Sequence, residues 1–409
     1  MQLMNKVAII GGGAAGLMAA ITASKSGINV DLYEQNSRVG KKILASGNGR
    51  CNIINTTSSA ADYFGEQPHF IDYALSLLPF SAFEKFCHSI GLLLEIKEDG
   101  RCYPLSNEAK SVVLSFESFA KASGVNFLTD TAVTKITYTD HHFTVTTPTG
   151  ENNYTKVLIT TGSEAAPQLG GNRDGYTFAN TFGHTIVPSY PSLVQLHIDS
   201  DFHHKMAGIK QFSEVTLYLN GKAEEKVKGD ILFTRYGISG FAILDLSQKA
   251  SLALMEYQSV RIGINLLPSF DRQKLSNQIT QLTQAVPTHS ITTMLSGLIS
   301  SKMVPLLLET AKIDPLTPSG TLSVKTVKKI AHTLQEWRFE ISDTHGFKHA
   351  EVSGGGISTE QIDEKTMESK LVKGLYFAGE VIDIVGRRGG FNFNFAWASG
   401  ALAGKSMAD

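Results

Sequence analysis

The sequence predicts an α/β protein in which a discontinuous α/β domain is interrupted by an inserted antiparallel β domain and a helical subdomain. Three observations predict this fold class. The first 50 residues contain an apolar strand, a glycine turn, a helix and a second strand. Alternating apolar and polar runs then dominate residues 192–265, and helical patterns dominate residues 270–336. Strand and glycine patterns return after residue 345, so the chain is expected to leave the first domain and re-enter it.

The N-terminal segment has the order of a dinucleotide-binding unit. An apolar run leads into G-x-G-x-x-G at Gly11, Gly13 and Gly16, and a helical pattern follows. Gly11 permits the tight turn, Gly13 lets the backbone approach a pyrophosphate, and Gly16 lets the helix pack closely on the strand. Glu34 lies 18 positions after Gly16, at the end of the second strand, where a carboxylate can accept hydrogen bonds from a ribose diol.

The composition is that of an ordinary globular protein. Of 409 residues, 42% are hydrophobic and 18% are charged, and the formal net charge is -1. A chain this close to neutrality has no overall field that attracts nucleic acid or an anionic membrane, so neither partner is expected. No run of about 20 apolar residues occurs, which argues against a spanning helix. The oligomeric state is left open.

The cysteine and histidine patterns indicate neither a disulfide framework nor a metal site. Cys51, Cys87 and Cys102 form no C-x-x-C motif and no metal-binding spacing. This usage, without a recognisable signal sequence, favours the cytoplasm. His203 and His204 are adjacent and would point in different directions on a regular element, so surface or turn positions are expected. No metal is predicted.

The remaining periodicity assigns the other elements of the first domain. Helices are expected at residues 68–96 and 107–123, and short strands at 126–130 and within 133–147. Residues 157–161 form an apolar run typical of a buried strand. In the insert, period-2 runs separated by turn signals such as Asn220-Gly221 predict an antiparallel sheet or barrel.

Four further segments carry chemistry. They are Arg38–Asn52, with its glycines and amide donors; Thr160–Gly162 at a strand end; Gly374–Glu380, a strand ending in Gly-Glu; and Gly389–Asn392, which opens an apolar helical run. A strand that ends in glycine is by itself usually a turn, so the order of the segments carries the signal. That order resembles the FAD-binding pattern of the glutathione-reductase/fumarate-reductase-like flavoproteins.

More narrowly, the chain resembles the bacterial aminoacetone oxidase-like flavoprotein family. Residues 40–55 read G-K-K-I-L-A-S-G-N-G-R-C-N-I-I-N, and residues 366–380 read T-M-E-S-K-L-V-K-G-L-Y-F-A-G-E. Residues 229–240 match the family's insert segment. The resemblance covers essentially the whole chain. It implies a Rossmann-like domain with noncovalent FAD at residues 1–190 and 345–409, a β-barrel at 191–268 and 337–344, and a helical subdomain at 269–336.

The resemblance also implies the cofactor-binding residues. The first glycine turn would hold the pyrophosphate, Gly379 and Glu380 would meet the ribityl chain, and Gly390 would open a helix whose N-terminus faces the flavin. The residues implied are Gly11, Gly13, Ala14, Ala15, Gly16, Glu34, Gln35, Lys42, Gly47, Arg50, Cys51, Asn52, Val133, Thr161, Gly162, Gly379, Glu380, Gly390, Phe391 and Asn392.

The chain departs from the family pattern at Arg387 and Arg388, where the family usually has small or polar residues. Two arginines near the expected flavin edge suggest an anionic substrate or the phosphate of NADPH, while surface arginines at a domain seam are an equal alternative. Arg101 and Tyr103 match a family segment and are candidates for the substrate pocket. Catalytic residues stay unknown, because the flavin itself carries the hard chemistry.

These features predict an FAD-dependent oxidoreductase that acts on a small organic substrate by flavin-mediated hydride transfer, with NAD(P)H as a transient donor. A second dinucleotide-binding turn for NAD(P)H is absent. The later glycine run, Gly354–Gly356, is followed by Thr359 at the position where the G-x-G-x-x-G pattern requires its last glycine. One alternative is an aminoacetone-like amine oxidase that passes electrons to oxygen, and another is a flavin redox sensor without turnover. A redox disulfide at Cys51 is disfavoured, because Thr56 stands where its partner should be.

Overall fold

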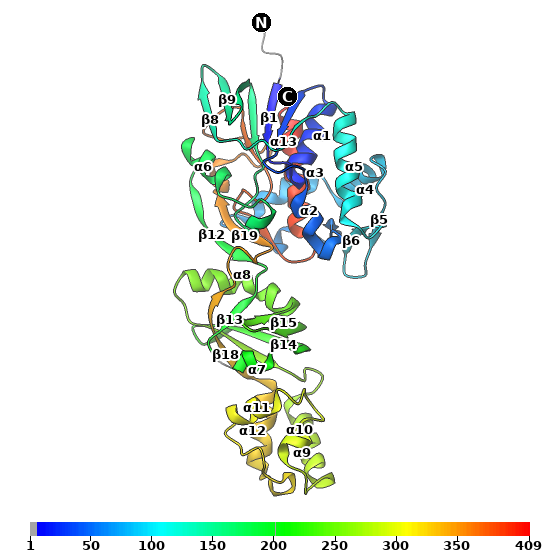
Figure 1. The fold of residues 1–409 in the computed structure, drawn as a ribbon, viewed down its shortest axis with the longest axis vertical. Coiled ribbons are helices and arrows are strands. Elements are labelled where there is room, and N and C mark those ends of the chain that lie inside the picture. Colours follow the sequence, from blue (N-terminus) through cyan, green and yellow to red (C-terminus); the bar gives the residue numbers. More distant parts are fainter. Residues whose placement is uncertain (1–5, 201) are drawn as a thin grey trace. The chain divides into compact units, whose positions relative to one another are not determined.

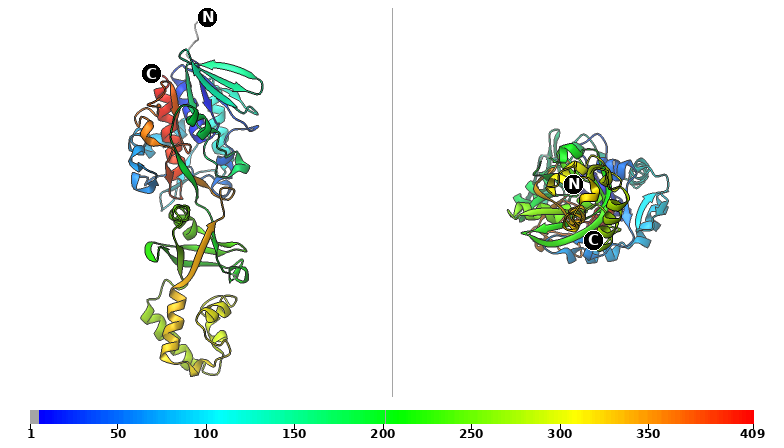
Figure 2. Two further views of the ribbon diagram at one scale, coloured as in Figure 1. Left: turned by 90° about the vertical axis from the view of Figure 1, so that its left-hand side faces the viewer. Right: turned by 90° about the horizontal axis from the view of Figure 1, so that it is seen from below.

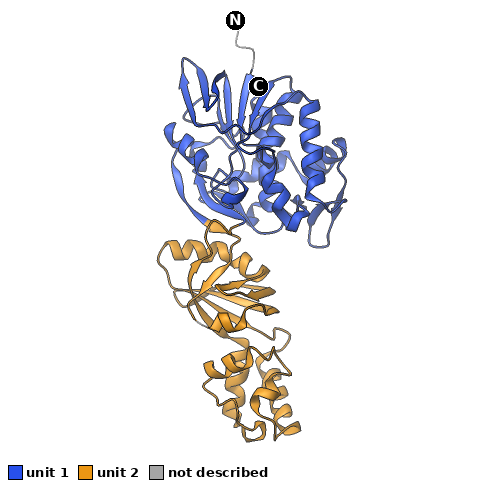
Figure 3. Ribbon diagram, in the orientation of Figure 1, with its two compact units in different colours: residues 1–190, 351–409 blue, residues 191–350 orange. Residues whose placement is uncertain are grey.

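The structure is a computed structural model, and it describes residues 6–200 and 202–409. The chain forms two compact units (Figure 3). The first, here called the Rossmann unit, comprises the residues up to Tyr190 and from Glu351 onward. The second, here called the inserted unit, spans Pro191–Ala350. In the described part of the chain, no helix has the length and apolar character needed to span a membrane.

A parallel sheet forms the centre of the Rossmann unit (Figure 1). Its strand order is β20-β11-β1-β2-β7, and neighbouring strands are parallel throughout. These strands are short apolar runs because both faces of the sheet are covered. The bounds are β1 Lys6–Ile10, β2 Asn29–Tyr33, β7 Asn126–Leu128, β11 Lys156–Ile159 and β20 Leu375–Phe377.

Two helices from opposite ends of the chain pack closely beside this sheet. They are α1, Ala14–Lys25, and α13, Phe391–Ser406, which lie side by side in Figure 1. A Cβ on Gly400 would lie 2.4 Å from the carbonyl oxygen of Ala15, and one on Gly404 would lie 2.5 Å from that of Ala19. Only glycine permits this approach, so the C-terminal helix locks the first turn of α1 in place.

The other elements of the Rossmann unit surround this centre. Residues 107–123 were expected to be helical and form α5. The prediction of one helix over residues 68–96 is correct only in part, because Leu94–Ile96 pairs as a strand. The helices are α2 Lys41–Ala45, α3 Asp72–Leu77, α4 Phe80–Ser89, α5 Ala109–Ala122 and α6 Asp174–Thr181. The strands are β3 Ile54–Asn55, β4 Tyr63–Phe64, β5 Leu94–Ile96, β6 Arg101–Pro104, β8 Lys135–Thr139, β9 His142–Thr147, β10 Gly150–Tyr154, β12 Ile186–Ser192, β19 Val352–Ile357 and β21 Val385–Gly386.

The inserted unit contains a closed barrel, which confirms the predicted fold class. Its strand order is β13-β16-β15-β14-β17-β18, and the pairs are antiparallel. Alternate apolar side chains, such as Val215 and Ile262, fill its interior. The bounds are β13 Leu196–Ile198, β14 Lys210–Leu219, β15 Lys222–Phe233, β16 Gly237–Ser239, β17 Val260–Asn265 and β18 Trp337–Thr344.

The interpretation of residues 192–265 as strands alone is wrong. They also contain α8, Phe241–Met255, and α7, Phe202–Met206. α8 is buried on most of its surface, so its sequence lacks the polar stripe by which a helix is recognised. His203 was expected at the surface or in a turn, but it is buried on α7 with its ring 4.1 Å from that of His204.

Helices complete the inserted unit between β17 and β18, as the sequence pattern predicted. Side-chain caps fix their starts, because Asp271, Ser290 and Ser323 each accept a backbone N–H three residues ahead. The last helix leads directly into β18, as the yellow and orange segments of Figure 2 show. The bounds are α9 Arg272–Ala285, α10 Ile291–Leu295, α11 Val304–Thr310 and α12 Val324–Gln335.

Candidate cofactor site

The first glycine turn has the geometry that its sequence spacing predicts. Gly11 has φ +114°, and a Cβ there would lie 2.4 Å from the carbonyl oxygen of Thr160. A Cβ on Gly16 would lie 1.9 Å from the carbonyl oxygen of Gly11. A Cβ on Gly13, in contrast, would meet no atom within 4 Å. Gly11 and Gly16 are therefore required for packing, whereas Gly13 faces open space in which a ligand can approach the backbone.

The N-terminus of α1 opens onto the same space. Gly13 is its N-cap residue and offers no side chain to the first N–H groups, and no acidic residue lies in the first turn. These N–H groups have no partner within the helix, and the helix dipole concentrates partial positive charge beside them. The turn therefore suits a pyrophosphate. Ala14 and Ala15 are the first helical residues here, and both are buried.

Glu34 lies beside this turn at the end of β2. One of its carboxylate oxygens accepts the Gly12 N–H at 3.0 Å, and the other accepts the backbone N–H of Asn36 at 2.8 Å. The side-chain amide of Asn36 donates to that second oxygen at 2.6 Å. These bonds fix the carboxylate at the turn and leave it acceptor capacity for a ribose diol. Gln35 points elsewhere, since its side-chain amide donates to the Gly170 carbonyl at 2.8 Å.

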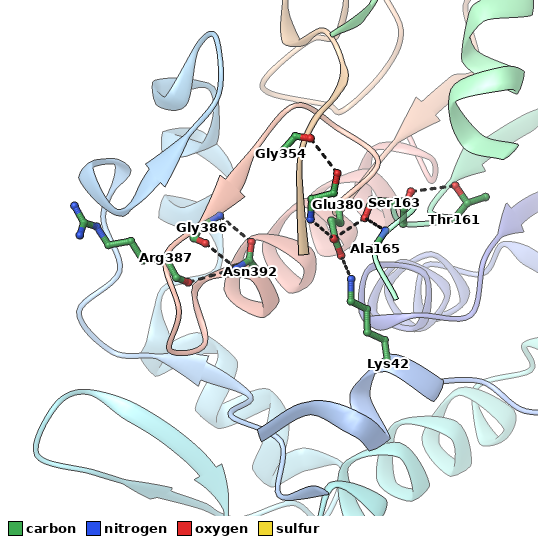
Figure 4. Close-up of polar contacts among 11 residues, drawn as sticks. Lys42, Thr161, Ser163, Ala165, Gly354, Glu380, Gly386, Arg387 and Asn392 are labelled. Carbon is green, nitrogen blue, oxygen red and sulfur yellow. Dashed lines mark hydrogen bonds and ion pairs between the residues drawn. The ribbon is translucent and has the colours of Figure 1, made fainter. Parts of the chain in front are cut away.

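The second glycine segment is joined to the first. The Gly40 N–H donates to the Gly12 carbonyl at 2.9 Å, and α2 begins at the next residue. From α2, the Lys42 ammonium reaches a Glu380 oxygen at 2.5 Å (Figure 4). The other Glu380 oxygen accepts the Ser163 hydroxyl at 2.7 Å and the Ser353 N–H at 3.0 Å. The Glu380 carboxylate is thus the meeting point of four segments that are distant in sequence.

The loop after α2 holds an aromatic contact and a buried thiol. The guanidinium of Arg50 lies over the Tyr103 ring, 5.2 Å from its centroid, and a Cβ on Gly47 would come within 3.7 Å of the same ring. Cys51 adopts a left-handed conformation with φ +60°, and its side chain is fully buried. Burial raises the pKa of the Cys51 thiol to about 12. The structure therefore places this thiol in the core, in its neutral form.

The N-terminus of α13 meets this loop. Gly390 has φ +98°, and a Cβ there would lie 2.6 Å from the Ile54 carbonyl and 2.9 Å from Asn52 Oδ1. Asn52 Oδ1 is buried and has no hydrogen-bond partner among the described residues. The side chain of Asn392 bonds both the N–H and the carbonyl of Gly386, so it fastens β21 to the helix (Figure 4). An unpartnered acceptor and an uncapped helix N-terminus therefore lie together, beside the buried Phe391 that opens the helix.

The remaining predicted cofactor residues occupy strand ends around the same turn. Gly162 has φ +75° and faces open space, and Thr161 precedes it at the end of β11. Gly379 follows β20, and a Cβ there would lie 2.9 Å from the Ala15 Cβ. Val133 is buried in the loop that follows Thr131, whose N–H donates to the Glu34 carbonyl at 3.0 Å. The parallel strands bring these segments to one edge of the sheet, where ligands of this fold bind.

The candidate substrate residues are less closely grouped. Arg101 pairs with Asp99 at 2.6 Å, and its Cγ and Cδ lie near Gly389. Arg387 is exposed, with its Nε 3.9 Å from a carboxylate oxygen of Asp62, and in Figure 4 it points away from the Lys42–Glu380 pair. Arg388 is half-buried beside it. Tyr103 is buried beneath Arg50.

Sequence reasoning missed two residues of this site. Ser163 and Ser353 both donate to Glu380, yet neither stands in a position that a motif marks. Ser163 directly follows the Thr160–Gly162 strand end, which is the one signal that pointed to it. Among the described residues, no group of three or more His, Cys, Asp or Glu side chains could hold a metal ion.

The residues present fit FAD. The open space at Gly13 and the uncapped α1 suit the pyrophosphate, the fixed carboxylate of Glu34 suits the adenosine ribose, and the orphan acceptor of Asn52 suits a donor on the ring or chain. FMN would use neither the pyrophosphate turn nor Glu34, so the adenosine side of the site favours the dinucleotide.

Comparison with known proteins decides the family. The family described as "HI0933-like protein Rossmann domain" matches residues 5–406. The chain belongs to this family. The "3-dehydro-bile acid delta(4,6)-reductase" of Clostridium scindens is 31% identical over 408 residues, covering 99% of this chain and 100% of that protein. The "Ribosomal RNA dihydrouridine synthase" of Haemophilus influenzae is 31% identical over 406 residues, 98% of each chain.

A solved structure shows the same fold. A flavocytochrome c3 fumarate reductase covers 100% of this chain and 78% of its own length, with a TM-score of 0.50 and 16% identity. The predicted resemblance to FAD-dependent flavoproteins is therefore confirmed, and the HI0933-like chain is an FAD-dependent oxidoreductase.

Proposed function

We propose that this oxidoreductase reduces a carbon–carbon double bond that is conjugated to a carbonyl group, with NAD(P)H as the electron donor. One observation carries the proposal. Two relatives with unrelated substrates, each matched over nearly its full length, are both named for adding hydrogen to a ring, a bile acid in one and uridine in the other. The shared reaction type is a better guide to this chain than either substrate.

The chain's residues have defined tasks in this reaction. FAD supplies the hydride transfer when bound. Gly13 and the N-terminus of α1 would hold its pyrophosphate, and Glu34 would hold its adenosine ribose. The Lys42–Glu380 pair would fix the strand end at Gly379 beside the ribityl chain. The uncapped N-terminus of α13 would place partial positive charge where negative charge develops.

The donor and the substrate follow from what the chain carries. It has no second G-x-G-x-x-G turn, so NAD(P)H would approach the flavin directly. Arg388, with Arg387 and Arg101 as secondary candidates, would receive an anionic group of NADPH or of the substrate. A small molecule is the expected substrate, and we place the protein in the cytoplasm, where its three free, buried cysteines would stay reduced.

A second candidate substrate is uracil within RNA. Its support is the printed name of the Haemophilus influenzae relative and of an Escherichia coli relative that is 30% identical over 394 residues. An amine oxidase of aminoacetone type and a flavin sensor without turnover are the remaining alternatives from the sequence pattern. These alternatives differ in which molecule gives electrons to the flavin and which molecule accepts them.

Anaerobic mixing separates these functions. The protein with FAD is mixed with NADH or NADPH, and bleaching of the flavin absorbance is followed. A conjugated enone steroid, a uridine-containing RNA or oxygen is then added. In a reductase, NAD(P)H bleaches the flavin absorbance, and an enone or RNA restores this absorbance faster than buffer does. Bleaching by aminoacetone, restored by oxygen, would indicate the oxidase; bleaching by no donor would reject turnover.

A further inference from the structure

The near-neutral charge of the whole chain conceals an asymmetry between its units. Residues 191–350 contain 17 Lys and Arg against 14 Asp and Glu, whereas the rest of the chain contains 20 against 24. The inserted unit is therefore net positive and the Rossmann unit net negative. A total charge near zero therefore does not exclude a polyanionic ligand that binds the inserted unit alone.

The positive charge gathers at a hollow of about 620 Å³ in the inserted unit. Three segments bring cations to it: Lys205 lies on α7, Arg235 in the turn after β15, and Lys302 in the turn before α11. His204 also lines it, and no Asp or Glu does so among the described residues. Two backbone bonds fix the wall, since the Gly208 N–H donates to Phe233 and the Phe233 N–H donates to Ile209.

These cations are not neutralised within the described structure. Lys205, Arg235 and Lys302 are exposed and take part in none of its ion pairs. On the neighbouring strands β14 and β15, in contrast, Lys210, Lys226 and Lys228 pair with carboxylates. Three like charges around one concavity produce a local positive potential that favours binding of an anion there.

A fourth group makes the hollow more than a charged surface. Thr234 lines it, and its Oγ1 is buried without a hydrogen-bond partner among the described residues. A buried hydroxyl without a partner costs free energy that a ligand oxygen would recover. Two ammonium groups, one guanidinium fork and one hydroxyl are the donors that phosphate oxygens take most readily.

We propose that this hollow binds a phosphate group, with Arg235 and Lys302 as its main contacts and Lys205 and Thr234 completing it. The phosphate would belong either to an RNA backbone or to a small phosphorylated molecule. The proposed site is formed by residues of the inserted unit alone and its test does not use the flavin, so the result is independent of the proposed reaction.

Binding to the FAD-loaded protein tests the site without measuring turnover. Fluorescence anisotropy with a labelled single-stranded RNA of 16 nucleotides and calorimetry with uridine monophosphate are carried out on the parent and on Lys205→Ala, Arg235→Ala and Lys302→Ala. Lys222→Ala is the matched control, because Lys222 is an exposed lysine of the same unit that forms no ion pair in the described structure and does not line the hollow.

Each hollow variant should weaken binding at least fivefold and reduce the slope of log affinity against log salt by about 0.7, while Lys222→Ala keeps parent affinity. Arg235→Lys should restore part of the loss, because the charge remains but the guanidinium fork is lost. RNA binding much tighter than that of the monophosphate identifies a polynucleotide, and equal affinities identify a small ligand. The proposal is overturned if neither probe binds, or if the hollow variants match Lys222→Ala with unchanged melting temperatures.

Discussion

The Lys42 ammonium and the Glu380 carboxylate form an ion pair of 2.5 Å that joins α2 to the end of β20, two segments more than 330 residues apart in sequence. Glu380 also accepts bonds from Ser163 and Ser353, so one carboxylate joins four segments of the chain. The chain thereby closes the cofactor site with residues from both parts of the Rossmann unit, on either side of the insert.

We predict that Lys42→Met lowers both FAD retention and stability. Glu380 would keep its two neutral hydrogen-bond donors but lose its charged one. We expect the free energy of unfolding to fall by about 1–3 kcal/mol, because the ion pair is only partly exposed to solvent. Urea unfolding of the apoprotein and the FAD-to-protein ratio after gel filtration measure the two effects.

Lys41→Met is the matched control, since Lys41 is one residue away and donates only to the Asn36 side chain. Glu380→Ala should be worse than either variant, because it leaves three donors without an acceptor. Equal stability and FAD content in Lys42→Met and Lys41→Met would contradict the prediction.

Substitutions of Gly13 and Gly16 should have different effects, on FAD binding in the first case and on stability in the second. Gly13→Val should lose FAD and leave the apoprotein folded, because the new side chain enters open space that the pyrophosphate would fill. Gly16→Ala should destabilise the fold itself, because its Cβ would lie 1.9 Å from the Gly11 carbonyl oxygen. Circular dichroism melting and cofactor content separate the two. If Gly13→Val retains stoichiometric FAD, the turn is not the phosphate site.

The contrast between these glycines and Glu380 shows what sequence can and cannot predict. The first turn is local, so the spacing of Gly11, Gly13 and Gly16 determines its geometry within six residues. The contacts of Glu380 with Ser163 and Ser353 depend on which strands become neighbours, and no local pattern records that. The barrel strands were predicted because alternation survives in sequence.

Helix α8 and the hollow of the inserted unit could not be predicted from local sequence patterns. α8 was missed because it is buried on most faces and therefore has no periodic polar stripe. Lys205 comes from helix α7, and Arg235 and Lys302 come from two separate turns, so counting charges along the chain could not reveal that they converge.

His184 should make stability depend on pH in the acid range. It is 1% exposed, its Nε2 lies 2.7 Å from the Ser369 hydroxyl, and burial lowers its pKa to about 4. Because the unfolded histidine has a pKa of about 6.5, the unfolded state takes up the proton first. Stability is therefore fully present above pH 6.5 and falls as the pH decreases toward 4, by roughly 3 kcal/mol from this group.

Urea unfolding at pH 7.5, 6 and 5 measures this loss. His184→Gln should have lower stability at pH 7.5 but a flatter decline toward pH 5, whereas His88→Gln, at an exposed position on α4, should follow the parent curve. A parallel decline in the parent and His184→Gln would show that other groups carry the acid sensitivity.

The cysteines should be inert in the native protein. Cys51, Cys87 and Cys102 are free and buried, and burial raises the pKa of each thiol, to about 12 for Cys51 and Cys102. Since the thiolate is the reactive form, iodoacetamide at pH 8 should modify none of them until urea unfolds the chain. Mass spectrometry checks the adducts. Rapid native labelling of Cys51 would mean that its loop opens, and would revive a redox role for this residue.

Two arginines, Arg387 and Arg388, precede the glycine pair that opens α13. Arg387 is exposed, with its guanidinium 5.6 Å from the centroid of the Phe64 ring and its Nε 3.9 Å from Asp62 Oδ1, whereas Arg388 is half-buried. If they receive an anion, each charge-assisted contact contributes about 1.5–3 kcal/mol, which corresponds to a tenfold to hundredfold change in affinity.

Arg388→Ala should therefore raise the KM for NADPH or an acidic substrate at least tenfold, and Arg387→Ala should raise it less, because contacts of the exposed Arg387 are screened by solvent more than those of the half-buried Arg388. The KM for NADH, which lacks the extra phosphate, should change little, and FAD content should stay at the parent level. Arg388→Lys should recover part of the loss, because the charge remains while the two-pronged geometry is lost. Steady-state kinetics with both donors decide the matter: if neither alanine variant changes any KM, the arginines are solvated surface charges, and the anion must be held by other residues.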